Sequence, residues 1–263
     1  MKRRHRNWRG FTILEMLMAM AIFLIICGAM FELLNLSQKK YNSETQLTAA
    51  FQDARLAMDQ IVRDVNISGY PAAGMLSNAA SSASYAVSPF AWDPGYSSNT
   101  DCQVGLTCSP TPGDFDLIVE TDLGSGVSWI RYQLVGTTLY RGVVPKSAGG
   151  DPVTATSAPD VLTPFLANVA NNAPGSLLTQ ITAQYPSMFP SEKPQPIFQY
   201  ICDTPGGPAP SAPCPSAGGS NSPKNIRDIG VNLIVITPQR DQQTQSLKLV
   251  ELIGMGHRVN PVN

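Results

Sequence analysis

Residues 9–15, Arg-Gly-Phe-Thr-Ile-Leu-Glu, open the stretch of sequence around which the rest of the chain is organised. Residues 1–10 hold five basic side chains and no acidic one, and residues 16–31 hold no charged side chain. Counted from Phe11, the apolar run reaches the length of roughly 20 residues that a helix needs to cross a bilayer. This pattern predicts a basic leader over residues 1–10 and a membrane-spanning helix over about residues 11–34.

Charge is unevenly distributed along the chain. The formal net charge is −1, but 13 basic residues stand against 19 acidic ones after Gly10. Nucleic-acid binding needs clustered Lys and Arg, so we expect no nucleic-acid partner for this acidic body. The basic leader precedes the apolar run, and the positive-inside rule therefore places the leader in the cytoplasm and the body beyond about residue 35 across the membrane.

Four of the five cysteines form two pairs that are close in sequence. Cys102 and Cys108 are six residues apart, Cys202 and Cys214 are twelve apart, and Cys27 lies in the apolar run. In an oxidising compartment these spacings favour two local disulfides over the alternative of free thiols in a reducing one. Neither pair has a spacing typical of zinc ligands, and we expect no metal or cofactor.

The helical pattern continues beyond the apolar run. Apolar residues recur at helical spacing over residues 47–65, and the polar residues between them, Asp64 among these, predict a solvated face. No proline occurs between residues 11 and 70, so the sequence predicts one helix over residues 11–66, ended by Gly69 and Pro71. The stripe consists of Leu47, Phe51, Ala54, Met58, Ile61 and Val65.

Residues 67–263 are expected to form a β-rich extracytoplasmic domain. Alternating patterns predict strands over residues 116–121, 127–134, 139–144, 197–201, 226–235 and 247–253, with a hairpin turn at 136–138. Residues 72–112 are interpreted as a surface excursion, and the Pro-rich passages 170–196 and 205–223 as loops. Residues 165–169 fit a short strand or a helical turn. The fold class is therefore α+β, with the helical stripe packed on an antiparallel sheet.

Little in the sequence indicates an enzyme. Outside the leader the one histidine is His257, for which we expect a solvent-facing position, and no metalloprotease, nucleophile-elbow or nucleotide-binding motif occurs. Asp114 and Asp116 are two acids in a loop, which is weak evidence for a cation site. No catalytic residue is predicted.

Glu15 is a carboxylate inside the apolar run. At mid-span such a charge costs about 2.5–3.5 kcal/mol on insertion scales, and less near an end. The side chain either reaches the interface or meets a positive partner supplied by another chain. Physical reasoning alone leaves both interpretations open.

The coincidence of a basic leader, Gly10, Phe11, Glu15 and an apolar run resembles the processing and methylation motif of type IV prepilins and pseudopilins. The resemblance implies that prepilin peptidase cleaves between Gly10 and Phe11 and methylates the new amine of Phe11. It also implies that Glu15, the fifth mature residue, pairs with the N-terminal amine of a neighbouring subunit. The implied partners are other pilins, prepilin peptidase and the bacterial inner membrane.

A weaker similarity extends into the body. Residues 54–65 and 68–70, with 198–200 and 226–231, are similar to PilW-type minor pilins and to J-type minor pseudopilins of type II secretion. Major pilins usually carry a helix-bending proline where Glu32 stands here. That departure and the larger body imply a minor component of a type IV pilus, with a type II secretion pseudopilin as the alternative.

Other anchors are also considered. A lipoprotein needs a small residue before its acylated cysteine, and Ile26 precedes Cys27. A signal-peptide cut near Ala29 would separate two parts of one continuous helical pattern. The remaining alternative is a membrane-anchored extracytoplasmic binding module that never assembles.

Overall fold

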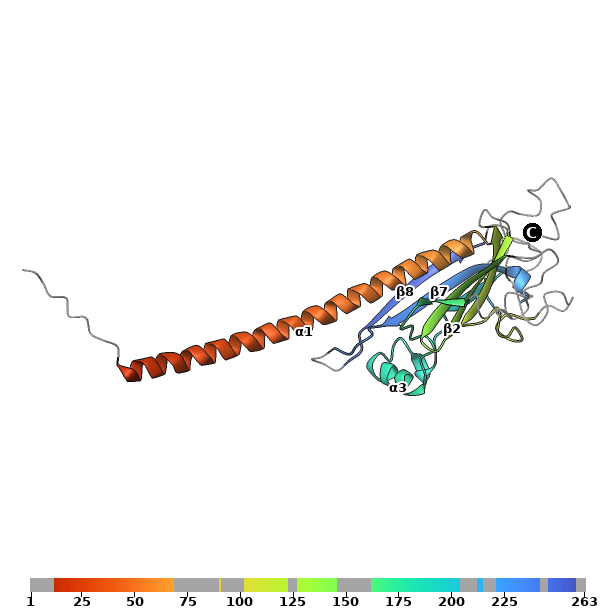
Figure 1. Ribbon diagram of the computed structural model, residues 1–263. Helices are drawn as coiled ribbons and strands as arrows, with labels where there is room; N and C mark the ends of the chain where they lie inside the picture. Colours follow the sequence, from red (N-terminus) through yellow and green to blue (C-terminus); the bar gives the residue numbers. More distant parts are fainter. Residues whose placement is uncertain are drawn as a thin grey trace, which may run out of the picture.

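A computed structural model describes residues 12–68, 90, 102–122, 127–145, 162–203, 212–214, 221–241 and 246–258. It confirms the α+β class: a long N-terminal helix is followed by antiparallel β-sheets (Figure 1). The helix projects far beyond the β-rich part of the molecule at its N-terminal end.

The long helix, α1, spans Ile13–Asn66 without interruption. It contains no proline, and its 54 residues extend about 80 Å at 1.5 Å per residue. Its last turn is closed by the Ile67 N–H, which donates to the Arg63 carbonyl at 3.1 Å. The expected stop at Gly69 and Pro71 lies outside the described residues. By length and composition, α1 is apolar enough at its N-terminal end to cross a membrane.

The described strands form two four-stranded antiparallel sheets, where the sequence suggested one. The first sheet has the order β1-β2-β3-β4 and is a meander; the second has the order β6-β5-β7-β8. Gly136 adopts φ +61° in the turn between β2 and β3, which is a conformation that favours glycine, so the expected hairpin forms there. The strands are β1 (Asp116–Asp122), β2 (Val127–Val135), β3 (Thr138–Pro145), β4 (Leu162–Leu166), β5 (Phe198–Cys202), β6 (Ala212–Pro213), β7 (Ile226–Ile236) and β8 (Leu249–His257).

A second helix lies where the sequence was interpreted as a Pro-rich loop. This helix, α3, spans Gly175–Gln184, and two short 3-10 turns occur at Pro190–Glu192 and Pro223–Asn225. Pro174 precedes the first turn of α3, where a missing N–H costs nothing. Ile181 of α3 packs against Ile234 and Ile236 of β7, which gives the second sheet a small apolar cluster of its own.

Most of the predicted helical stripe is buried in the main core. Ala54, Ile61 and Val65 are fully buried and pack with residues of both sheets, while Phe51 remains 40% exposed. The surface excursion predicted for residues 72–112 is wrong for Phe90 and Val104, which both lie in that core. Phe90 also forms a β-bridge with Val119 of β1.

Two glycines of β8 allow α1 to approach the second sheet closely. A Cβ atom on Gly256 would lie 2.6–2.7 Å from Val65 side-chain atoms, and one on Gly254 would lie 2.6 Å from the Met58 sulfur. No real side chain fits in either space without movement of the helix residue. These glycines are therefore required by packing rather than by backbone conformation.

Asp64 was expected on the solvated face of the helix, and this prediction is wrong. Its side chain is 1% exposed and accepts hydrogen bonds from the Tyr132 hydroxyl at 2.6 Å and from Arg141 Nη2 at 2.8 Å. Burial and the neighbouring carboxylate raise the pKa of Tyr132, so this hydroxyl stays protonated and donates. This triad of Asp64, Tyr132 and Arg141 joins α1 to the first sheet.

Gly256→Ala tests the close approach of α1 to β8. The new methyl group meets the β-branched Val65, which has little freedom to move, and should reduce the free energy of unfolding by about 1–3 kcal/mol. Gly254→Ala should cost less because the end of the flexible Met58 can shift. Urea unfolding of the full chain in detergent measures both. Gly230→Ala is the control, since its Cβ meets nothing closer than 3.6 Å; an equal loss in all three variants would contradict the packing argument.

Asp64→Ala tests the triad. Removing the carboxylate leaves a guanidinium and a hydroxyl without their buried acceptor, and should lower the free energy of unfolding by about 3–5 kcal/mol. Asp59→Ala, at an exposed position of the same helix, should change it by less than about 0.5 kcal/mol. Near-wild-type stability of Asp64→Ala would show that the triad does not hold the helix to the first sheet.

Candidate assembly surface and domain cavity

Glu15 takes part in the N-terminal cap of α1. The Thr12 hydroxyl oxygen accepts from the Glu15 N–H at 3.3 Å, and the Glu15 carboxylate accepts from the Thr12 N–H and hydroxyl, both at 3.0 Å. This reciprocal arrangement is a capping box, and it places the carboxylate at the positive end of the helix dipole. The acid that looked isolated in the sequence therefore stabilises the first turn of its own helix.

Gly10 and Phe11, the residues of the expected cleavage and methylation site, lie outside the described residues. The described part of the motif begins at Thr12. From there to Gln38 no residue of α1 is buried, and Cys27 alone is partly buried. Nothing in the described chain covers the apolar side chains of this segment, so they are available to lipid or to other helices.

The domain first contacts α1 near the middle of the helix. Lys248 Nζ lies 2.9 Å from Glu44 Oε1, and the Ser43 hydroxyl donates to Asp241 Oδ2 at 2.8 Å. These polar contacts join the β7–β8 end of the second sheet to the helix. They divide α1 into a bare segment, residues 13–42, and a docked segment, residues 43–66.

Both expected disulfides are present. Cys102 is bonded to Cys108 and Cys202 to Cys214, while Cys27 is a free thiol. Within the described residues no group of three or more His, Cys, Asp or Glu side chains is arranged to hold a metal ion. His257 is largely exposed, as expected, and its Nδ1 lies 2.6 Å from Asp228 Oδ1.

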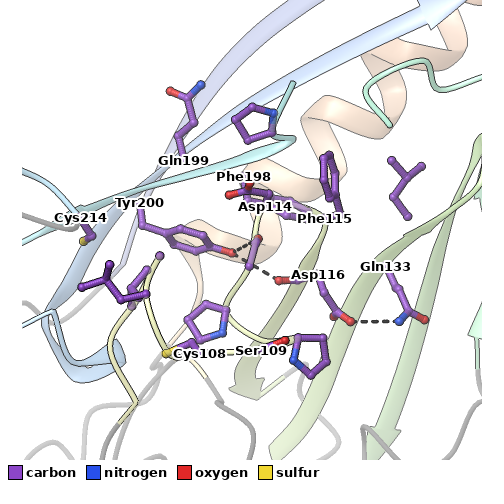
Figure 2. Close-up of a pocket in the computed structure, with 18 of the residues that line it drawn as sticks. Cys108, Ser109, Asp114, Phe115, Asp116, Gln133, Phe198, Gln199, Tyr200 and Cys214 are labelled. Atoms are coloured by element: carbon purple, nitrogen blue, oxygen red, sulfur yellow. Dashed lines mark hydrogen bonds between the residues drawn. The ribbon is translucent and has the colours of Figure 1, made fainter. Parts of the chain in front are cut away.

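The two disulfide loops border a cavity of about 720 Å³ at the junction of the two sheets (Figure 2). Its wall includes the first disulfide loop, the segment 109–116, β2, β5 and the end of the second disulfide loop. The Tyr200 hydroxyl donates to the Gly113 carbonyl at 2.8 Å and thereby ties β5 to the segment before β1. Sequence patterns could not indicate this cavity because its wall combines segments that are far apart in the chain.

The two acids of the cavity wall have different surroundings. Asp116 is buried and accepts from Arg131 Nε at 3.0 Å and Nη2 at 2.5 Å, and from Gln133 Nε2 at 3.1 Å. Burial raises the pKa of Asp116 in spite of Arg131, which opposes the shift. Burial also raises the pKa of Asp114, although this residue is exposed to solvent. The weak expectation of a shared cation site is not met by Asp116, whose carboxylate is already paired.

A family model described as the prokaryotic N-terminal methylation motif matches residues 6–31. The match contains Gly10, Phe11 and Glu15 and does not extend into the β-rich domain. Neither the curated proteins nor the solved structures contain a chain that matches this one. Together, the motif and the bare apolar helix that follows it indicate a type IV pilin-like prepilin, which is a structural type of protein with a membrane-anchoring N-terminal helix.

Proposed function

We propose that the chain is a minor pilin, a structural subunit in the assembly, priming or tip complex of a type IV pilus. The observation that carries this proposal is the bare segment of α1, residues 13–42. It overlaps the matched motif over residues 13–31, has a capped carboxylate in its first turn, and leaves its large apolar side chains exposed.

In the proposed pathway the precursor lies in the bacterial inner membrane with residues 1–10 in the cytoplasm and the β-rich domain in the periplasm. Prepilin peptidase cleaves between Gly10 and Phe11 and methylates the new amine of Phe11. The amine of a neighbouring subunit then pairs with the Glu15 carboxylate. The cap at Thr12 supports this role, because it holds the Glu15 carboxylate at the N-terminal end of the helix. The N-terminus of a neighbouring subunit would lie near this end in a bundle of parallel helices.

Assembly then exchanges lipid contacts of the bare segment for contacts with parallel helices of other pilins. Lipid tails and apolar side chains are about equally apolar, so close packing and polar pairs have to supply the specificity. Pairing of Glu15 removes an uncompensated charge from an apolar bundle, where it is costly. The domain remains at the surface of the pilus and contacts sister subunits.

Two features favour a minor over a major pilin: the large domain that follows the helix, and Glu32 at the position where major pilins usually have a proline. The helix continues through Glu32 without the proline that bends major pilins, and it carries a domain with two disulfide loops. The similarity of residues 54–65 and 198–200 to PilW-type minor pilins agrees with this assignment. A J-type pseudopilin of type II secretion is the second candidate, because the same residues resemble that class.

Mass spectrometry of the mature N-terminus separates the assembling classes from a membrane-anchored binding module that never assembles. For a pilin or pseudopilin we expect a mature chain that begins with N-methylated Phe11 in cells that contain prepilin peptidase. The same cells without the peptidase should yield the uncut chain. A retained leader in the presence of the peptidase, or a cut near Ala29, would rule out the proposed function.

Glu15→Ala separates anchoring from assembly. The variant should remain membrane-inserted and be cleaved, while its incorporation into sheared pili should fall at least about tenfold, because a neighbour's amine would enter the bundle without a partner. Glu32→Ala, which removes a second exposed carboxylate from the same helix, should incorporate like wild type. Immunoblots of membrane and pilus fractions measure both. Normal incorporation of Glu15→Ala would contradict the assigned role of this acid.

A further inference from the structure

The charged residues that line the cavity between the disulfide loops, among those described, are all acidic. None of the described residues that line it is Lys, Arg or His, whereas two are acids, Asp114 and Asp116. The Asp116 carboxylate is compensated by Arg131 and by a hydrogen bond from Gln133. The Asp114 carboxylate has no such contact with any described side chain. Among the described residues, the cavity therefore carries one negative charge, that of Asp114, without a positive partner.

The position of Asp114 is fixed by its backbone. The carbonyl oxygen of Asp114 accepts hydrogen bonds from the N–H groups of Ile197 at 2.9 Å and Phe198 at 3.1 Å, so the residue is held between β1 and β5. The Cys102–Cys108 disulfide closes the described loop on one side of the cavity. A ligand would meet a preformed site and lose little free energy in ordering it.

The other groups of the wall narrow the class of ligand. Three polar side chains of the wall are engaged with one another or with the backbone: Gln133 donates to Asp116, and the Tyr200 hydroxyl donates to the Gly113 carbonyl (Figure 2). Ser109, Asn172 and Gln199 add further polar side chains to the wall. An anion needs a positive group, and none of the described lining residues supplies one, so this wall does not suit an anion. Much of the remaining surface is aliphatic and rigid, and it is formed by Leu106, Pro110, Pro112, Pro196 and Pro213. Such a surface fits a methylene chain.

We propose that this cavity binds a primary alkylammonium group on an aliphatic stem, with the ammonium at Asp114 and the stem against the prolines. Asp114 is exposed and therefore open to a ligand, and its partial burial raises the pKa of its carboxyl, a shift that an incoming cation would oppose. Two sources offer the required chemistry, a lysine side chain of another protein and a free diamine. The binding does not depend on pilus assembly, and it adds a recognition function to the domain.

Saturation-transfer NMR on the full chain in detergent micelles tests the proposal. The probes are acetyl-Ala-Lys-Ala-amide, 1,5-diaminopentane, the uncharged peptide acetyl-Ala-norleucine-Ala-amide, and maltotriose. We expect saturation of the lysyl peptide, of the diamine or of both, and none of the norleucine peptide or maltotriose. Signal from the peptide alone identifies a protein partner, and signal from the diamine alone identifies a free amine. Equal signals from the lysyl and norleucine peptides, maltotriose binding alone, or no signal from either amine overturns the proposal.

Asp114→Asn provides the matched variant. Its dissociation constant for the bound amine should rise at least about tenfold, whereas Asp59→Asn, an exposed acid of α1 away from the cavity, should leave it unchanged. A destabilised fold would not explain weaker amine binding by Asp114→Asn. A raised folded-state pKa means that the Asp114 carboxylate costs stability above that pKa, and the cost disappears below the pKa of the unfolded chain. The neutral variant should therefore be at least as heat-stable as wild type at pH 7. Retained amine binding by Asp114→Asn would refute the site.

Discussion

The docking of residues 43–66 of α1 onto both sheets is the interaction on which the rest of the domain depends. Toward the second sheet the contact is apolar and close, because Gly254 and Gly256 leave room for Met58 and Val65. Toward the first sheet it is polar, through the buried pairing of Asp64 with Arg141. The described strands of the two sheets share no ladder, but the segment after β4 bonds to β7, where the Ala170 N–H donates to the Ile234 carbonyl at 2.7 Å. The helix reinforces this direct link by packing on both sheets.

This docking explains how one uninterrupted helix serves two environments. In the docked segment small and β-branched residues point into the core, and most polar residues other than Asp64 face solvent. Over residues 16–31 of the bare segment apolar residues cover all sides of the helix, which is the composition of a helix surrounded by lipid or by other helices. Polar contacts at Ser43 and Glu44 mark the change between the two. The helix needs no break because backbone hydrogen bonding is the same in both environments.

Patterns that depend on neighbouring residues were predictable from the sequence, and contacts between distant residues were not. Alternation located β1, β2, β3, β5 and β7, since strand side chains alternate between two faces wherever one face is buried. Asp64 was misplaced because its partners, Tyr132 and Arg141, lie 68 and 77 residues away. Phe90 was missed because it enters the core from a segment without periodicity. The helix α3 was missed because nearby prolines outweighed a short apolar pattern.

The same distinction applies to the candidate sites. Glu15 was identified from the sequence because the motif is local, although its cap with Thr12 required the structure. The cavity at Asp114 combines five separate segments, and no single stretch indicates it.

The continuity of α1 links these two sites mechanically. From Glu15 to Ser43 the helix rises about 42 Å at 1.5 Å per residue, with no proline to bend it. The gentle curve of the helix in Figure 1 leaves this path unbroken. If pairing at Glu15 sets the axial position of the subunit, the helix transmits that position to the domain, and the triad at Asp64 transmits it to the first sheet. A shift in register at the N-terminus would therefore displace the cavity by the same distance along the fibre. In the proposed pilus, assembly at one end of the helix would thus determine where the cavity at the other end is presented.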